Sequence, residues 1–187
     1  METQKASSKE KLIKLVTAAM FAAMICVMTM LVEIPVGVDG YIHLGDCFIL
    51  IAAWVLGPVY GFAAAGIGSA FADLFSGYSH YVPGTFFIKG LMALAAALIV
   101  HAFIKKSDKL RIPGYIVSGI VAEDIMVCGY YLYYALLLGR GWGAALLKVP
   151  GNVVQGASGV ILGVIISTVI AQTKLFKKVH YDYSYAM

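Results

Sequence analysis

The sequence predicts an all-α, polytopic membrane protein with six transmembrane helices and with both termini in the cytoplasm. Its composition is the first observation: 61% of the 187 residues are hydrophobic and 13% are charged. That charged fraction is about half the value of a typical soluble domain. One small core cannot hide so much apolar surface, so much of it must face lipid. The basic residues form no stripe interleaved with aromatic residues, so the lipid bilayer and not nucleic acid is the expected partner.

The second observation is that the apolar residues fall into runs. The runs cover residues 12–32, 44–56, 59–75, 85–104, 112–138 and 149–171. A spanning helix needs about 20 apolar residues, within a range of about 17 to 25. The run 44–56 falls short, and only Gly57 and Pro58 separate it from the next. The two runs could therefore form two helices, or one long helix kinked at the proline.

The third observation, the distribution of lysine and arginine, favours two helices. With six spans, 11 of the 14 basic residues lie on the inner side, while Arg140 and Lys148 lie in outer loops and Lys89 lies in the membrane. Merging the two runs removes this asymmetry, which membrane proteins normally show. The expected organisation is a cytoplasmic N-terminal tail (1–11), a six-helix membrane domain (12–173) and a cytoplasmic C-terminal tail (174–187).

Inside the apolar runs lie the charged residues Asp73, Lys89, Glu123 and Asp124. Each charge at mid-membrane costs about 2.5–3.5 kcal/mol on insertion scales. One interpretation is an ion pair between Lys89 and a carboxylate, with Glu123 or Asp124 as candidates, that only fixes helix packing. Ionisable residues inside a membrane usually mark a functional site. We therefore expect these residues to line a solvated ligand cavity.

Helical spacing places further polar residues beside this cavity. Glu123, Tyr130 and Tyr134 share one stripe of the fifth predicted helix. Asn152 and Gln155 share a face at the outer end of the last helix. Interfacial tyrosines and interhelical amide hydrogen bonds are the alternative explanations. Lys89 lies at a similar depth, and the first outer loop can cover the site. The predicted substrate-binding residues are Tyr41, His43, Lys89, Glu123, Tyr130, Tyr134, Asn152 and Gln155.

No constellation typical of an enzyme or a metal site is visible. The candidate metal ligands are scattered: His43, His80, His101, His180, Cys26, Cys47 and Cys128. The sequence also lacks a nucleophile–base spacing and a phosphate-binding loop, so we expect no catalytic residues, no metal and no cofactor. A stand-alone channel or a structural membrane protein is the alternative from another class. A channel needs a continuous polar stripe, and the inner halves of the fourth and sixth predicted helices are almost wholly apolar.

Several short motifs occur in order along the chain: GD at 45–46, GP at 57–58, ADLFSGY at 72–78, TFFIKG at 85–90 and PGNVVQ at 150–155. Together they resemble the membrane-embedded S component of an energy-coupling-factor (ECF) vitamin transporter, over nearly the whole chain. The resemblance implies a six-helix subunit of a bacterial plasma membrane that captures a vitamin or precursor from outside. It also implies partners, a transmembrane T component and two cytoplasmic ATPases, which would hydrolyse the ATP.

The first predicted helix carries a spacing of small residues that the ECF family uses. The A-x-x-x-A pattern occurs twice, as Ala18 with Ala22 and as Ala19 with Ala23. Small residues four apart allow close approach of another helix. That helix can belong to the chain itself or to a partner, and the resemblance favours docking with the T component.

The resemblance does not fix the ligand. A lysine, one or two acids, two amides and several tyrosines suit a small, flat, hydroxylated heteroaromatic ring. We expect a pyridoxine- or hydroxymethylpyrimidine-like ligand, with riboflavin as the alternative within the family.

Overall fold

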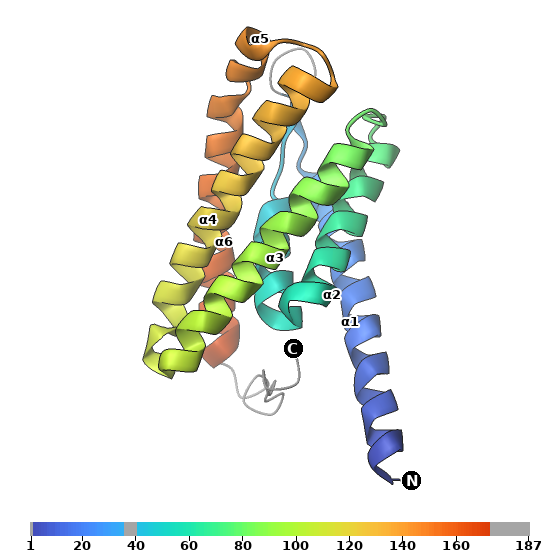
Figure 1. Cartoon of the computed structure of the whole chain (residues 1–187), viewed down its shortest axis with the longest axis vertical. Helices are drawn as coiled ribbons and strands as arrows, with labels where there is room; N and C mark the ends of the chain where they lie inside the picture. The colour runs from blue at the N-terminus through green and yellow to red at the C-terminus, as the bar shows by residue number, and fades with distance from the viewer. Residues whose placement is uncertain (1, 36–40, 173–187) are drawn as a thin grey trace.

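A computed structural model of the protein describes residues 2–35 and 41–172 (Figure 1). Its elements are α1 (Glu2–Leu31), β1 (Ile34–Pro35), β2 (Tyr41–Ile42), α2 (Gly45–Phe75), α3 (Val82–Lys106), the 3-10 turn η1 (Asp108–Leu110), α4 (Arg111–Leu132), the π-helical turn η2 (Tyr133–Leu137), α5 (Trp142–Leu146) and α6 (Val149–Gln172). The strands pair antiparallel, with Ile34 opposite Ile42. Within the described part of the chain, five helical segments are long and apolar enough to cross a membrane. The predicted all-α, polytopic class is confirmed.

The predicted count of six spanning helices is off by one, because α2 forms a single 31-residue element. It is divided at Gly57, whose φ of 78° and ψ of −174° are not helical. Positive φ is readily available to glycine and disfavoured for other residues. The chain folds back here, since a Cβ atom on Gly61 would stand 3.1 Å from the Cα of Ala53. We call residues 45–56 the short arm and residues 58–75 the long arm of α2.

The short arm is too short to cross a bilayer alone, and the protein surrounds it. All of its residues except Phe48 and Val55 are buried, and α2 packs against α1, α3 and α6. Trp54 stacks on Tyr115 of α4 with 4.5 Å between ring centroids, and its indole N–H donates to Ser118 Oγ at 2.9 Å. The sixth predicted span is therefore a core element that neighbouring helices shield from lipid.

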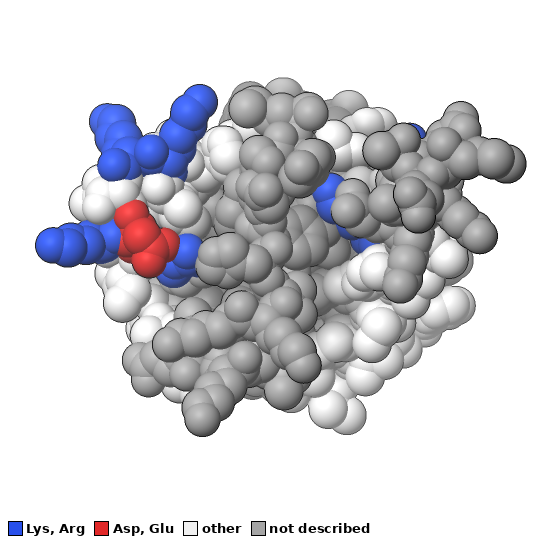
Figure 2. Space-filling model, turned by 90° about the horizontal axis from the view of Figure 1, so that it is seen from below, with Lys and Arg blue, Asp and Glu red and all other residues white. Residues whose placement is uncertain are grey.

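The two ends of the molecule differ in charge and in the elements they carry. The N-terminus, the α3–α4 connection and the end of α6 lie at one end, and the strands and α5 lie at the other (Figure 1). Lysine and arginine side chains gather on the first of these ends (Figure 2). Lys105 and Lys106 end α3, and Arg111 pairs with Asp108 beside them. The positive-inside rule makes this the cytoplasmic end. Residues 174–187, the predicted C-terminal tail, lie outside the described residues.

Candidate functional site

A cavity opens at the outer end of the bundle, between β2, the end of α2, the starts of α3 and α6, and the outer part of α4. Its enclosed volume is about 70 Å³, and it continues into an opening toward solvent. A concave site with convergent polar groups is the usual form of a small-molecule site.

The walls of the cavity are largely aromatic, and five of the lining residues are tyrosines. Tyr81 and Tyr134 lie nearly parallel, at 9° and with 6.4 Å between ring centroids. Tyr41 and Tyr78 face each other across 4.9 Å. The Lys148 ammonium stands 4.4 Å above the Tyr134 ring. Such walls favour a flat, partly polar ring, since aromatic faces pack against one another and tyrosine keeps a polar end.

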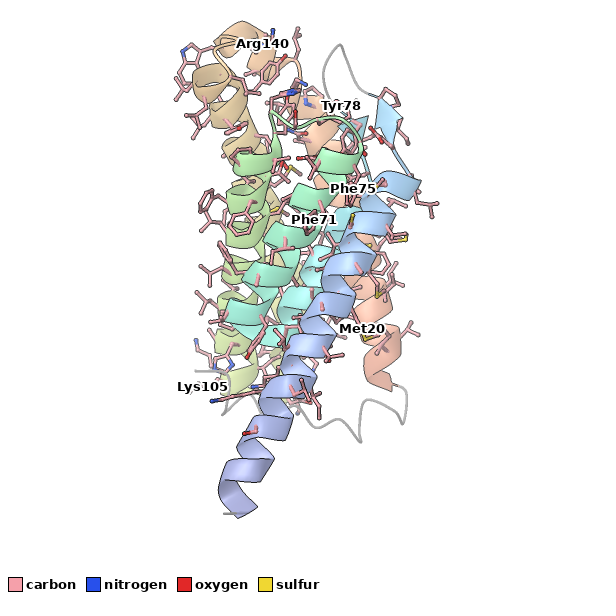
Figure 3. All side chains as sticks on the ribbon, turned by 90° about the vertical axis from the view of Figure 1, so that its right-hand side faces the viewer. Met20, Phe71, Phe75, Tyr78, Lys105 and Arg140 are labelled. Carbon is pink, nitrogen blue, oxygen red and sulfur yellow. The ribbon has the colours of Figure 1, made fainter. Side chains whose placement is uncertain are left out.

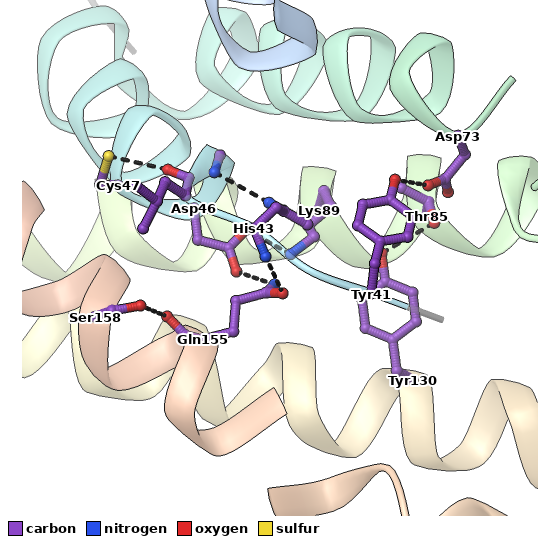
Figure 4. A network of polar contacts seen from close by, with 12 residues as sticks. Tyr41, His43, Asp46, Cys47, Asp73, Thr85, Lys89, Tyr130, Gln155 and Ser158 are labelled. Carbon is purple, nitrogen blue, oxygen red and sulfur yellow. Dashed lines mark hydrogen bonds and ion pairs between the residues drawn. The ribbon is translucent and has the colours of Figure 1, made fainter. Parts of the chain in front are cut away.

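A hydrogen-bonded network forms the floor of the cavity (Figure 4). Lys89 of α3 and Asp46 of α2, both fully buried, form an ion pair at 2.5 Å. The side-chain amide of Gln155 donates to the other Asp46 oxygen at 2.6 Å, and its carbonyl accepts the backbone N–H of His43 at 3.1 Å. The network joins α2, α3 and α6 to the segment that follows β2.

His43 belongs to this network as a neutral side chain. Burial is the main cause that lowers its pKa from 6.5 to about 4; the charge of Lys89 adds to this effect and that of Asp46 opposes it. Its Nδ1 atom accepts the backbone N–H of Gly45 at 3.0 Å, which requires an unprotonated Nδ1. The neutral imidazole therefore locks the turn that leads into the short arm.

A second polar cluster lies in the wall, at the outer end of the long arm. Tyr41 Oη donates to Asp73 Oδ1 at 2.8 Å. Burial, followed by the nearby charge of Asp73, raises the pKa of Tyr41, so its hydroxyl keeps its proton. Beside them, the hydroxyls of Thr85 and Tyr130 are 2.9 Å apart. The second oxygen of Asp73, Oδ2, is buried and has no hydrogen-bond partner in the part of the chain that the structure describes.

Glu123 lies behind the floor and does not line the cavity. It is buried against α6, where glycines leave room: a Cβ on Gly159 would stand 3.0 Å from both Glu123 Oε1 and Asp46 Cβ. Neither Glu123 oxygen has a hydrogen-bond partner within the described residues. Asp124, the next residue, is exposed on the outer face of α4.

The structure brings most of the predicted site residues to the cavity. Those that line it are Tyr41, His43, Tyr130, Tyr134, Asn152 and Gln155. Lys89 belongs to the network that forms the floor but does not itself line the cavity. It pairs with Asp46, so the suggested pairing with Glu123 or Asp124 was wrong. Asp46 was not predicted as an intramembrane charge, although it too interrupts an apolar run.

Seven other lining residues are not among the eight predicted substrate-binding residues, although Asp73 was expected in the cavity as an intramembrane charge. They are Ile42, Asp73, Tyr78, Tyr81, Thr85, Lys148 and Gly151. The sequence did indicate Asp73, because it is a charged residue inside an apolar run. The short strands were missed too, although Asp39-Gly40 just before β2 is a dipeptide typical of hairpin turns.

The alanines of α1 divide between two environments. Ala18 is buried and Ala22 partly buried, and a Cβ on Gly68 of α2 would stand 2.5 Å from the Ala22 carbonyl oxygen. Ala19 and Ala23 are exposed. All four line an apolar groove between α1 and the long arm of α2, on the side of the molecule seen in Figure 3, where Met20, Phe71 and Phe75 are labelled.

Comparison with known proteins gives consistent matches. The family model described as "ECF-type riboflavin transporter, S component" matches residues 9–172. A protein of Pyrococcus woesei, described as "Uncharacterized protein in gap 3'region", is 37% identical over 141 residues, which cover 74% of this chain and 88% of that protein.

Two solved structures share the fold. The S component of a bacterial ECF transporter aligns with a TM-score of 0.63 and 23% identity, covering 86% of this chain and 96% of the other. The S component for biotin from an ECF-type ABC transporter aligns with a TM-score of 0.59 and 17% identity, covering 88% and 94%.

Proposed function

The chain belongs to the family of ECF-type riboflavin transporter S components, and we propose that it captures a pyridoxine- or hydroxymethylpyrimidine-like ring from the outer face of the plasma membrane. It is a multi-pass membrane protein of a transport family, whose members take part in vitamin uptake and are not enzymes. We propose the identity of the ligand, the face of the membrane from which it is captured, and the residues that bind it.

The observation that carries the proposal is the outer cavity with its tyrosine walls and polar floor. Half-buried Asn152 and the hydroxyls of Thr85 and Tyr130 supply the few directional hydrogen bonds that such a site needs. Beneath the floor, the core is apolar, with Ile49, Leu50 and Met126 fully buried. A closed floor supports capture of a ligand over free passage through a channel.

Titration of the purified subunit, without ATP or partners, tests this proposal. We expect pyridoxine or 4-amino-5-hydroxymethyl-2-methylpyrimidine to bind saturably and to change tyrosine fluorescence, because a preformed cavity needs no energy input for capture. Tyr134→Ala should weaken that binding, whereas Leu137→Ala, at an exposed position on the same turn, serves as the matched control. Absence of saturable binding of every B vitamin and precursor tested would overturn the proposal.

Riboflavin is the second candidate, because it gives the matching family its name. It is larger than a single-ring vitamin, so its ribityl chain would extend to the mouth of the cavity. Its yellow colour makes the test direct: riboflavin that co-purifies in stoichiometric amount with the subunit would favour this candidate.

We also propose that the subunit assembles with a T component and two ATPases, which hydrolyse the ATP, and that Ala18, Ala19, Ala22 and Ala23 form part of the contact. Small residues support close helix packing where lipid provides no hydrophobic drive. The buried positions already serve packing within the chain, so Ala19 and Ala23 are the better sites for a test.

Ala19→Trp and Ala23→Trp should block co-purification with the T component and leave ligand binding intact. Ile120→Trp, at an exposed position of α4, is the matched control. Normal assembly of both alanine variants would place the contact elsewhere.

A further inference from the structure

Asp73 stands out among the residues that line the cavity, because it combines burial with an unused acceptor. It is 7% exposed, and Tyr41 occupies only one of its two carboxyl oxygens. Among residues 2–35 and 41–172, the other oxygen has no hydrogen-bond partner. Buried polar atoms are nearly always paired in native proteins, so an orphaned acceptor beside a cavity calls for an explanation.

The carboxyl group of Asp73 forms no ion pair with a described lysine or arginine. Within the described residues, no lysine or arginine lies within ion-pair distance of Asp73; Lys89 is committed to Asp46, and the Lys148 ammonium lies over Tyr134. A buried carboxylate without a cation is costly unless something else neutralises it or donates to it. A ligand that carries the missing donor would remove that cost on binding.

The surroundings of Asp73 restrict where such a donor can lie. Tyr41, Thr85 and Tyr130 line the cavity together with Asp73 (Figure 4). The hydroxyls of Thr85 and Tyr130 bond to each other, so at most one of their two protons remains for a ligand acceptor. This corner therefore offers a strong acceptor beside at most one donor. That pattern complements a ligand edge with an N–H group next to an acceptor atom.

We propose that Asp73 anchors the ligand and that the ligand presents to it a basic nitrogen, either a ring N–H or an amino group on a nitrogen heterocycle. The inference rests on the proposed function and deepens it by naming the ligand's chemistry. A protonated or amino-substituted ring nitrogen donates to Oδ2 and offsets the charge of the carboxylate, whereas an uncharged ring without that donor does neither. The site is thus built for nitrogen bases such as aminopyrimidines and pyridines.

Matched ligand pairs test this on the unmodified protein. One pair is 4-amino-5-hydroxymethyl-2-methylpyrimidine and its analogue with a hydrogen in place of the amino group. The other is pyridoxine and its analogue with a ring C–H in place of the nitrogen. We expect the nitrogen-donor member of a pair to bind about 10- to 100-fold more tightly, as for a hydrogen bond to a charged group. Equal affinity within both pairs would overturn the inference, whatever any variant does.

Asp73→Asn then assigns the preference to this residue. We expect this variant to lose most of the 10- to 100-fold preference, and the control variant Asp124→Asn to keep it, because Asp124 is an exposed acid outside the cavity. A preference that survives in a folded Asp73→Asn protein would also overturn the inference. Failure of every compound to bind would instead overturn the proposed function.

Discussion

Asp46 and Asp73 are both buried aspartates of α2, one at the start of the short arm and the other near the end of the long arm. Both oxygens of Asp46 have partners, Lys89 and Gln155. Asp73 has one partner, Tyr41, and one free oxygen. Burial alone does not distinguish a structural charge from a binding group in this protein. An unpaired acceptor in a residue that lines the cavity distinguishes Asp73 from Asp46, and also from Glu123, whose unpaired oxygens lie outside the cavity.

The largest expected effect comes from breaking the completed pair. Lys89→Met leaves Asp46 buried without a cation, which typically costs about 3–5 kcal/mol of unfolding free energy. Unfolding titrations in mixed micelles measure it. The double variant Asp46→Asn/Lys89→Met should recover much of the loss, because it leaves no unpaired charge. A single variant as stable as the parent protein would show that the floor does not depend on this pair.

The network also predicts a dependence on pH through His43. Its pKa in the folded protein, about 4, lies below the ordinary value of 6.5. Between these values the unfolded chain binds more protons, so the free energy of unfolding falls as the pH is lowered, by up to about 3 kcal/mol. Stability curves at several pH values should show this loss between pH 6.5 and 4. Subtracting the curve of His43→Asn isolates the part of the loss that comes from His43. If the two proteins gave identical curves, the pH dependence could not be assigned to His43.

A smaller loss of unfolding free energy is expected from a change in the cavity wall. Tyr41→Phe removes the donor to Asp73 and leaves a second buried oxygen unpaired, at a cost of about 1–3 kcal/mol in the empty protein. A nitrogen base at saturation should restore part of that stability. The ligand-induced shift in melting temperature, compared between variant and parent, measures this. If the ligand-free variant and parent melted at the same temperature, the hydrogen bond from Tyr41 to Asp73 would not contribute to stability. The contrast drawn between Asp73 and Asp46 would then fail.

The smallest effect is expected for Asp124, the exposed acid of α4. Asp124→Asn removes no interaction with the described residues, so the free energy of unfolding in detergent should change by about 0.5 kcal/mol or less. Thermal unfolding of the variant next to its parent is sufficient. A large loss of unfolding free energy would mean that Asp124 stabilises the fold despite its exposure, as we expect for the two buried aspartates.

Much of this architecture could be predicted from composition and charge, because lipid imposes strong rules on length and polarity. The helical class and the cytoplasmic end follow from composition and charge, and four of the lining residues, Tyr130, Tyr134, Asn152 and Gln155, follow from spacing along single helices. Contacts between helices could not be predicted in the same way. The choice of Asp46 as the partner of Lys89 depends on how α2 and α3 pack, and periodicity within one helix carries no information about that packing.

The count of spans was off for a related reason. A run of 13 apolar residues looks like a short span when only its length and polarity are known. Whether lipid or protein surrounds such a run depends on tertiary packing. The same is true of the cavity wall, whose tyrosines come from β2, the loop after α2, α4 and η2.

The fold-back at Gly57 has a consequence for how the chain enters the membrane during synthesis. The short arm is too brief to be held in a bilayer by itself, and it carries Asp46 before Lys89 has been made. We expect residues 45–75 to insert as one helical hairpin, with Asp46 kept near the outer interface until α3 arrives. The short arm would then take its final place only after Lys89 is available to pair with Asp46. A nascent chain that ends before Lys89 should therefore remain accessible to protease at the start of α2.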